Sequence, residues 1–350
     1  MSFADANWIG RRVFVTGATG LLGSHLVRML CERQAEVIVL AREQVPSSLF
    51  YSSCPEWNLV SKVTVVKGSI EDEGIFGRIL DEHEPDTVIH LAGQAIVQTA
   101  NLSPIPTFKL NIEGTWNLLE AIRLHPKEVS RVIIASSARA YARSEGGAHD
   151  ESFPLRGDHP YDVSKSCADL IARSYAIAYK LPICITRCAN FFGPGDLNYS
   201  RIIPGTIRSV LQGKSPVIRS NGKSVRDFLY VEDAASAYLT LAEEMERNDF
   251  RGEAFNFSYG SKLTALEIVE QVLEIMSRGD LKATVLNQAV NEVPVESLNS
   301  TKAREILGWR PRFGFLEGLH KTVKWYSQIL AEDINFRFVD SPLKNIEASK

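Results

Sequence analysis

The stretch VFVTGATGLLGSHLVRML, residues 13–30, decides the fold. An apolar, β-branched run over 13–16 enters a G-x-x-G-x-x-G loop, and the apolar spacing that follows predicts a helix over 24–30. Glycines let the backbone turn sharply, and the free N–H groups and dipole of a helix N-terminus favour an anion. The stretch therefore predicts a Rossmann βα unit that holds the pyrophosphate of a dinucleotide.

The same alternation of a buried strand and a helical period continues through the first half of the chain. Strand-like runs recur at AEVIVLAR (35–42), KVTVVKGS (62–69), PDTVIHLAG (85–93), RVIIASS (131–137) and LPICITRCANFFGPG (181–195). Such a pattern is typical of a parallel sheet covered by helices on both faces. We expect an α/β fold, a doubly wound Rossmann sheet of about seven strands with a smaller C-terminal substrate lobe.

The domain organisation follows from a change in composition. From about Gly193 onward, Pro and Gly become frequent and the apolar runs shorten. We expect residues 1–188, joined by 226–260, to form the Rossmann domain, and 189–350 to form mainly the substrate lobe over the carboxyl edge of the sheet. The last 15 residues, 336–350, lack a period and read as a loose tail.

Composition excludes several classes of function. The 350 residues carry 39 basic and 42 acidic side chains, mixed along the chain, for a net charge of -3, which favours neither nucleic acid nor an anionic membrane as a partner. Arg11 and Arg12 superficially resemble an export leader, but the glycine spacing explains this region better, and no apolar stretch is long enough to span a membrane.

The cysteines point to a reducing compartment. Their number, five, is odd, and none forms a C-x-x-C pair, which argues against a disulfide framework and against a structural zinc site. Cys184 and Cys188 are expected to be small buried side chains rather than metal ligands. We expect a cytoplasmic protein with no metal.

The end of the second predicted strand bears on the choice of cofactor. Enzymes that prefer NAD usually place a carboxylate here for the ribose hydroxyls, and this chain has Ala41-Arg42-Glu43. Arg42 can pair with the 2′-phosphate of NADP, stack on adenine, or be only a solvated charge, while Glu43 can still reach a ribose. These residues alone leave NAD and NADP open.

Three residues suggest catalysis. Ser137 ends a strand, and Tyr161 and Lys165 stand four apart on a predicted helix, which puts them on one face. A neighbouring ammonium and the positive charge of a nicotinamide favour the phenolate of a tyrosine. Tyr161 can then accept a hydroxyl proton as hydride leaves the same carbon, with Ser137 bonded to the reacting oxygen and Lys165 holding the nicotinamide ribose.

Together these motifs resemble the extended short-chain dehydrogenase/reductases, in particular the nucleotide-sugar epimerase/dehydratase group, from Arg12 to about Tyr326. His90-Leu91-Ala92-Gly93-Gln94 resembles a family segment that lines the cofactor, Asn111 matches an asparagine that holds that region together, and Ser69 stands where an aspartate usually contacts adenine. The resemblance implies NAD, with NADP as an alternative, bound by Gly17, Thr19, Gly20, Leu21, Leu22, Gly23, Arg42, Ser69, Ile70, Leu91, Ala92, Gly93, Asn111, Tyr161 and Lys165.

Two further segments resemble family elements that bind the substrate. Residues 187–195, RCANFFGPG, are similar to the R-x-x-N-x-[YF]-G-P-G loop, and residues 226–233, RDFLYVED, to the R-D-[FY]-x-x-V-x-D element. The resemblance implies a nucleotide-diphosphate sugar whose phosphates need positive partners. The implied substrate contacts are Gln94, Ser137, Arg139, Asn190, Arg201, Arg219 and Arg226.

The overall likeness is strongest to CDP-glucose 4,6-dehydratases, but it stops beside the catalytic serine. Dehydratases carry an acidic residue and then Glu or Lys there, for the elimination, whereas this chain has Ala138 and Arg139, which cannot serve as the acid and base. The string Ser136-Ser137-Ala138-x-x-Tyr141 instead resembles 4-epimerases. Arg139 is expected either to face a carboxylate or another anion at C6 of the sugar or to form a salt bridge with Glu145, Asp150 or Glu151.

The leading expectation is therefore a nucleotide-sugar 4-epimerase that works through a transient 4-keto intermediate with bound NAD. The alternatives are a CDP-glucose-type 4,6-dehydratase or a UDP-glucuronate decarboxylase, an NADP-dependent keto-sugar reductase, and a non-catalytic binding protein. Family habit suggests a homodimer through two long helices, 105–124 and 161–180. Specificity is expected in residues 94–106, 196–208 and 289–300.

Overall fold

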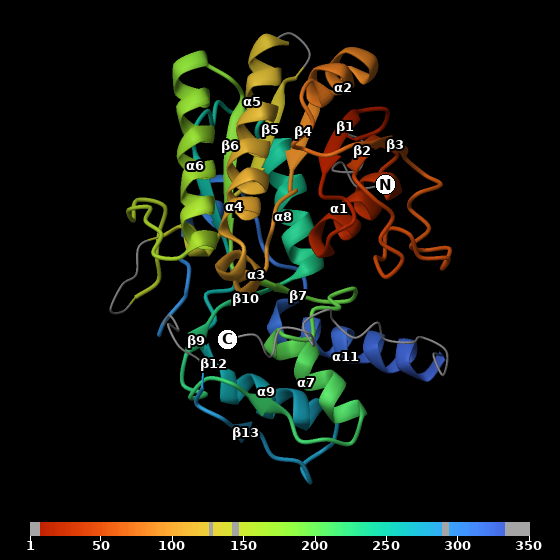
Figure 1. Ribbon diagram of the computed structural model, residues 1–350, viewed down its shortest axis with the longest axis vertical. Helices are drawn as coiled ribbons and strands as arrows, with labels where there is room; N and C mark the ends of the chain where they lie inside the picture. Colours follow the sequence, from red (N-terminus) through yellow and green to blue (C-terminus); the bar gives the residue numbers. More distant parts are fainter. Residues whose placement is uncertain (1–7, 126–128, 142–146, 289–293, 333–350) are drawn as a thin grey trace, which may run out of the picture.

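The fold is built on a parallel sheet, as the sequence predicts. The computed structural model describes residues 8–125, 129–141, 147–288 and 294–332. Among these, seven strands form one sheet in the order β11-β6-β5-β4-β1-β2-β3 (Figure 1). The strands are β1 (Arg12–Thr16), β2 (Glu36–Ala41), β3 (Thr64–Lys67), β4 (Thr87–His90), β5 (Arg131–Ala135), β6 (Ile183–Cys188) and β11 (Ala254–Phe257). The order reverses between β1 and β4, which opens a crevice at their carboxyl ends.

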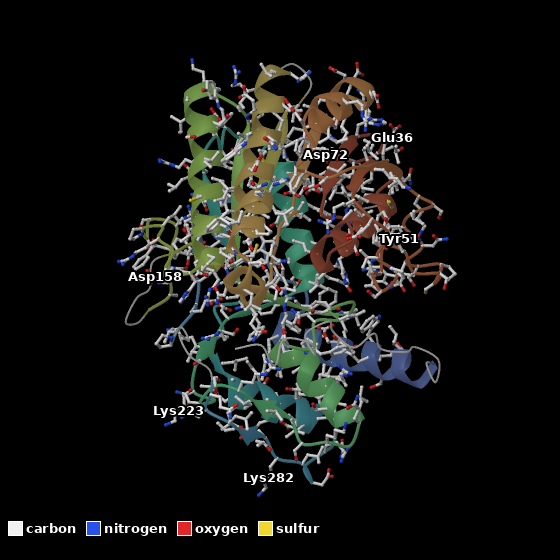
Figure 2. The ribbon with its side chains drawn as sticks, viewed as in Figure 1. Glu36, Tyr51, Asp72, Asp158, Lys223 and Lys282 are labelled. Atoms are coloured by element: carbon white, nitrogen blue, oxygen red, sulfur yellow. The ribbon has the colours of Figure 1, made fainter. Side chains whose placement is uncertain are left out.

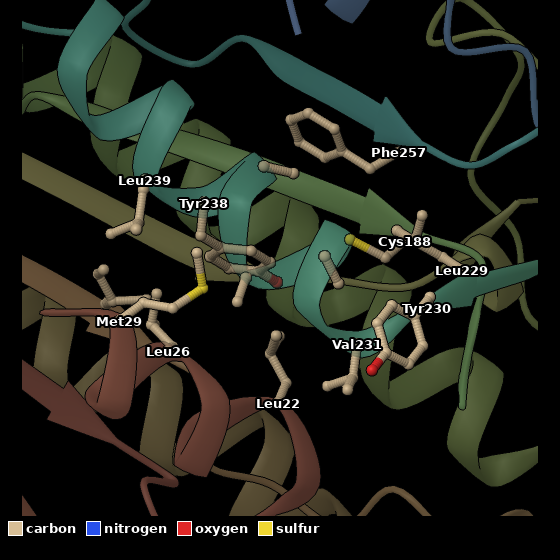
Figure 3. Packing of buried hydrophobic residues seen from close by; sticks show 14 of the residues in the cluster. Leu22, Leu26, Met29, Cys188, Leu229, Tyr230, Val231, Tyr238, Leu239 and Phe257 are labelled. Carbon is tan, nitrogen blue, oxygen red and sulfur yellow. The ribbon is translucent and has the colours of Figure 1, made fainter. Parts of the chain in front are cut away.

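Alternation along the strands explains why helices cover both faces. Val13 and Val15 of β1 pack into a core with α1 (Leu21–Glu32) and α8 (Val231–Glu244), while Phe14 between them joins the opposite core. That second core includes α2 (Ile75–His83), α5 (Gly114–Leu124) and α6 (Pro160–Tyr179). Figure 3 shows the first core, where Leu22, Leu26 and Met29 of α1 lie near Tyr238 and Leu239 of α8.

The helical region after β4 differs in detail from the single helix that we expected over 105–124. It consists of α3 (Val97–Leu102), α4 (Pro104–Phe108), a π-helical turn η2 (Lys109–Glu113) and α5. Apolar spacing does not reveal a π-turn, because the turn changes only the local backbone pairing. π-Turns inside helices are frequent at functional sites, and this one carries Asn111.

The smaller lobe lies below the carboxyl edge of the sheet in Figure 1. Its core joins Val210 and Ile218 to Val269 and Leu273. Its elements are β7 (Asn190–Phe192), α7 (Ile202–Leu211), β8 (Val217–Ile218), β9 (Val225–Arg226), β10 (Phe228–Tyr230), β12 (Leu263–Thr264), α9 (Ala265–Ile275), β13 (Thr284–Val285) and α11 (Gly314–Glu332). The short helix α10 (Thr301–Ile306) packs against β11 at the edge of the large sheet. Between these elements the chain returns to the large sheet through α8 and β11.

A buried ion pair fixes the point where the chain leaves the sheet for the smaller lobe. Arg187 on β6 donates from Nε and Nη2 to the two carboxylate oxygens of Asp169 on α6, at 2.8 and 2.9 Å. Both side chains are almost fully buried. Such a two-bond pair has a defined orientation, so it sets the direction of the loop that follows β6.

Other expectations have simple outcomes. Cys184 and Cys188 are both buried, as expected. In the part of the chain that the structure describes, we find no helix that combines the length and the apolarity needed to cross a membrane. The predicted tail, 336–350, lies outside the described residues.

Candidate active site

A cavity of about 1140 Å³ lies where the smaller lobe meets the carboxyl edge of the sheet. Of the site residues predicted from the sequence, those that line it are Gly17, Thr19, Gly20, Leu21, Leu22, Gly23, Arg42, Ser69, Ile70, Leu91, Ala92, Gly93, Gln94, Ser137, Arg139, Tyr161, Lys165, Asn190, Arg201, Arg219 and Arg226. Asn111 does not line the cavity but lies directly behind it. The structure thus brings the predicted cofactor and substrate residues together.

The glycine loop has the backbone that a dinucleotide site needs. Gly17 has a φ of +74°, and a Cβ there would lie 2.7 Å from the backbone nitrogen of Ala92. Gly20 caps α1 without a side-chain hydrogen bond, and the first turn of α1 has no acidic residue. Because α1 begins at Leu21, its first N–H groups lie at the cavity with no competing anion, and the loop fits a pyrophosphate.

A buried hydrogen-bond chain fixes the floor of the cavity. Ala92 N donates to Thr16 Oγ1 at 3.1 Å, and Thr16 Oγ1 lies 2.8 Å from His90 Nδ1. Burial lowers the pKa of His90 to about 3, so the ring is neutral. Thr115 Oγ1 donates its proton to the backbone carbonyl of Asn111. The same hydroxyl oxygen can therefore accept a hydrogen bond from His90 Nε2, at 3.3 Å. These hydrogen bonds therefore connect β1 and β4 to the π-turn.

Asn111 carries this support to the wall of the cavity. Its Oδ1 accepts from Gln94 N at 2.7 Å, and its Nδ2 donates to Gln94 O at 3.1 Å and to Ser164 Oγ at 2.9 Å. A Cβ on Gly93 would lie 2.6 Å from Asn111 Oδ1. The asparagine thus holds the segment after β4 against α6, which agrees with the role implied by the resemblance.

Ser137, Tyr161 and Lys165 meet at the centre of the cavity. All three side chains line its wall. Lys165 Nζ donates to Ala135 O at 2.8 Å, and burial lowers the pKa of Lys165 to about 8. Burial raises the pKa of Tyr161, while the bond to Ser137 and the charges of Arg139 and Arg201 oppose that rise. This arrangement suits a proton transfer at a hydroxyl held between Ser137 and Tyr161.

Beside these three residues, Arg139 is paired with acids other than those we expected. Its Nε and Nη2 donate to Asp162 at 2.9 and 3.3 Å, and its Nη1 donates to Glu296 at 3.4 Å. Asp150 instead accepts from Ser152, Glu151 accepts from Asn256 N, and Glu145 lies outside the described residues. The reason is the short 3-10 turn η3 (Ala138–Ala140), which directs Arg139 toward the start of α6.

Sequence reasoning missed Asp162 and Glu296. Asp162 directly follows Tyr161, but no motif marked it as a partner of Arg139. Glu296 gave no signal at all, because it follows no recognisable motif and reaches the cavity only through the pairing of Val295 with Val225. Ala138 is buried and carries no group that transfers a proton.

Arginines of the smaller lobe supply positive charge to the cavity. Arg201 is paired with Asp196 at 3.1 Å, and Arg219 and Arg226 also line the wall. Lys223 and Lys282 point outward from the lobe in Figure 2 and do not line the cavity. The part of the cavity wall formed by the smaller lobe can therefore bind an anionic ligand through its arginines.

Residues 13–257 match the model of the NAD dependent epimerase/dehydratase family. The chain belongs to this family. This match confirms the expected enzyme class and the expected cofactor, NAD. It also supports the resemblance to the extended short-chain dehydrogenase/reductases. The residues alone left NAD and NADP open, and the family match supports NAD.

Relatives that resemble the chain across nearly its whole length are named for different reactions. The human dTDP-D-glucose 4,6-dehydratase is 27% identical over 321 residues, which cover 91% of this chain and 90% of that protein. The structure of UDP-glucose 4-epimerase from Thermotoga maritima has a TM-score of 0.81 at 30% identity, covering 91% of this chain and 99% of that one. A dTDP-glucose 4,6-dehydratase from Streptomyces venezuelae, crystallised with NAD, has a TM-score of 0.81 at 27% identity and covers 92% and 98%.

We predict that Gly17→Ala weakens NAD binding by at least roughly tenfold, because its Cβ would push the backbone of Ala92 out of place. Gly74→Ala is a matched control, since Gly74 has a φ of +75° but nothing lies within 4 Å of its Cβ position. Isothermal titration calorimetry with NAD compares the two variants. Equal affinity in both would contradict the assignment of the glycine loop.

Proposed function

We propose that this enzyme is a nucleotide-sugar 4-epimerase that works through a transient 4-keto intermediate. The observation that carries the proposal is the pair of residues after Ser137. Ala138 has no proton to transfer, and Arg139 is held in an ion pair with Asp162 and Glu296. Ser137, Tyr161 and Lys165 are the members of the predicted catalytic set that line the cavity, and these suffice to oxidise and reduce one hydroxyl.

The residues divide this work as follows. Tyr161 accepts the proton of the C4 hydroxyl, and Ser137 donates to the same oxygen as it becomes a carbonyl. Lys165 lines the same cavity one helical turn after Tyr161, and its ammonium would hold the nicotinamide ribose and favour the phenolate. Bound NAD supplies the acceptor for the hydride from C4. When the 4-keto sugar turns its other face toward the cofactor, the hydride would return to C4 on that face while Tyr161 returns the proton to the C4 oxygen, and C4 is inverted.

We assign the nucleotide diphosphate to the smaller lobe. Arg219 and Arg226 line that side of the cavity, and Arg201 lies at its edge beside Asp196. Arginine pairs with phosphate oxygens through two parallel hydrogen bonds, which gives both affinity and orientation. Asn190 would place the sugar next to Tyr161, and the segments 94–106 and 196–208 would select its identity.

A 4,6-dehydratase is the second candidate, because several curated relatives carry that name. That reaction removes a proton from C5 and expels the hydroxyl group at C6, so it needs an acid and a base besides Tyr161. Positions 138 and 139 do not supply them. The two candidates give different products, C4 epimers and a 4-keto-6-deoxy sugar.

We predict that the enzyme, incubated with NAD and CDP-, UDP-, GDP- or dTDP-hexoses, yields C4 epimers without net change in NAD, and that Tyr161→Phe lowers this rate by roughly 10²- to 10⁴-fold. Proton NMR of the products gives both results. Tyr179→Phe, on the exposed end of α6, serves as the control and should keep full activity. A 4-keto-6-deoxy product, or full activity in Tyr161→Phe, would contradict the proposal.

We also propose a cytoplasmic homodimer. All five cysteines are free, as expected in a reducing compartment. The outer faces of α5 and α6 expose large apolar side chains, with Trp116 at 43%, Leu170 at 53% and Ile177 at 60% exposure. Neighbouring apolar residues of this size favour burial against a second copy related by a two-fold axis.

The dimer proposal predicts the behaviour of a double variant. Leu170→Glu with Ile177→Glu should halve the mass measured by size-exclusion chromatography with light scattering, because it places two charges on each side of the interface. Leu316→Glu, on the equally exposed Leu316 of α11, should leave the mass unchanged. A wild-type protein that elutes with the mass of one chain would overturn the proposal.

A further inference from the structure

Glu296 occupies a position in the cavity that the proposed chemistry does not use. It belongs to the smaller lobe, its side chain is only 8% exposed, and it lines the cavity together with Arg139 and Asn190. Oε1 accepts from Asn190 Nδ2 at 2.7 Å, and Oε2 accepts from Arg139 Nη1 at 3.4 Å. Burying a carboxylate costs free energy, so we ask which ligand group Glu296 binds or repels.

The backbone around Glu296 is held firmly in place. Glu296 N donates to Val225 O at 3.1 Å, and Val225 N donates to Pro294 O at 2.8 Å. On the following residues, Leu298 N donates to Asp227 Oδ2 at 3.1 Å. These bonds fix the segment against β9, which also carries Arg226, so the position of the carboxylate is set by the smaller lobe.

The charges beside Tyr161 do not cancel. The guanidinium of Arg139 makes two hydrogen bonds to Asp162 and one longer bond to Glu296, so one positive charge faces two carboxylates. The cluster of Arg139, Asp162 and Glu296 therefore carries one excess negative charge, and a further negative charge placed against Glu296 is repelled at low dielectric.

Glu296 also keeps free acceptor capacity. A carboxylate has about four lone-pair sites, and the two protein bonds occupy one on each oxygen. The remaining sites can accept from a hydroxyl or amine of a ligand in the cavity. Arg139, in contrast, directs three hydrogen bonds to carboxylates, which leaves it poorly suited to recognise a further carboxylate.

We propose that Glu296 determines substrate specificity: it accepts a hydrogen bond from a hydroxyl or amine of the sugar and excludes sugars that carry a carboxylate. This inference rests on the proposed function only in taking the ligand to be a nucleotide sugar. Arg139 then acts as a positioning residue that orients Glu296 and Asp162, and uronates are poor ligands of the wild-type enzyme.

The test compares the affinities of UDP-glucose and UDP-glucuronate for the NAD-loaded enzyme by calorimetry. The nucleotide is the same in both, so the ratio of the dissociation constants isolates the sugar carboxylate. We expect the wild type to favour UDP-glucose by at least roughly tenfold, and Glu296→Gln, which keeps the size and the polar group, to lower that preference by roughly tenfold or more.

Two control variants make the result specific. Glu305→Gln removes an exposed carboxylate of α10 outside the cavity and should keep the wild-type preference. Glu296→Asp keeps the negative charge and should keep most of the preference, which separates charge from any loss of folding. Equal binding of both sugars by the wild type, or an unchanged preference in Glu296→Gln, would overturn the inference.

Failure of the inference is distinguishable from failure of the epimerase proposal, because binding is measured without turnover. An enzyme that inverts C4 of hexoses but shows no role for Glu296 in the affinity ratio refutes only the inference. An enzyme whose preference depends on Glu296 but that yields no epimers refutes only the epimerase proposal.

Discussion

The close contact between Gly17 and the backbone of Leu91 and Ala92 is the constraint on which the site depends. It joins the loops after β1 and β4, the two neighbouring strands between which the strand order reverses. Any side chain at position 17 would push these loops apart. The contact places the N-terminus of α1, the segment held by Asn111 and the proposed catalytic residues after β5 around one cavity, within reach of a single extended cofactor.

The chemistry of the site depends on the titratable and charged side chains that are buried on opposite sides of that cavity. Burial lowers the pKa of Lys165 to about 8 and raises that of Tyr161, so burial favours the neutral form of each group, and the charges of Arg139 and Arg201 oppose this effect at Tyr161. On the opposite side, Arg139, Asp162 and Glu296 form a cluster with an excess negative charge. A neutral sugar between these two sides can lose and regain a proton at one hydroxyl without placing a new net charge beside the carboxylates.

Much of this was predictable from sequence because it is local. The glycine loop, the strand repeats and the i, i+4 spacing of Tyr161 and Lys165 each encode geometry within a few residues, and all of them occupy the expected elements. The π-turn at Lys109–Glu113 was missed because it leaves no trace in apolar spacing. The partners of Arg139 were missed for a different reason: Glu296 lies 157 residues away and is placed by backbone pairing with β9.

The central claim is that only C4 of the sugar is oxidised and reduced, and that no proton is removed from carbon. The most direct measurement is the reaction in D₂O with the hexose that the enzyme accepts, followed by NMR and mass spectrometry of the product. The account predicts C4 epimers with no deuterium on carbon, because the hydrogen taken from C4 is returned to C4. A product with deuterium at C5, or one that has lost its C6 hydroxyl, would contradict it and show elimination.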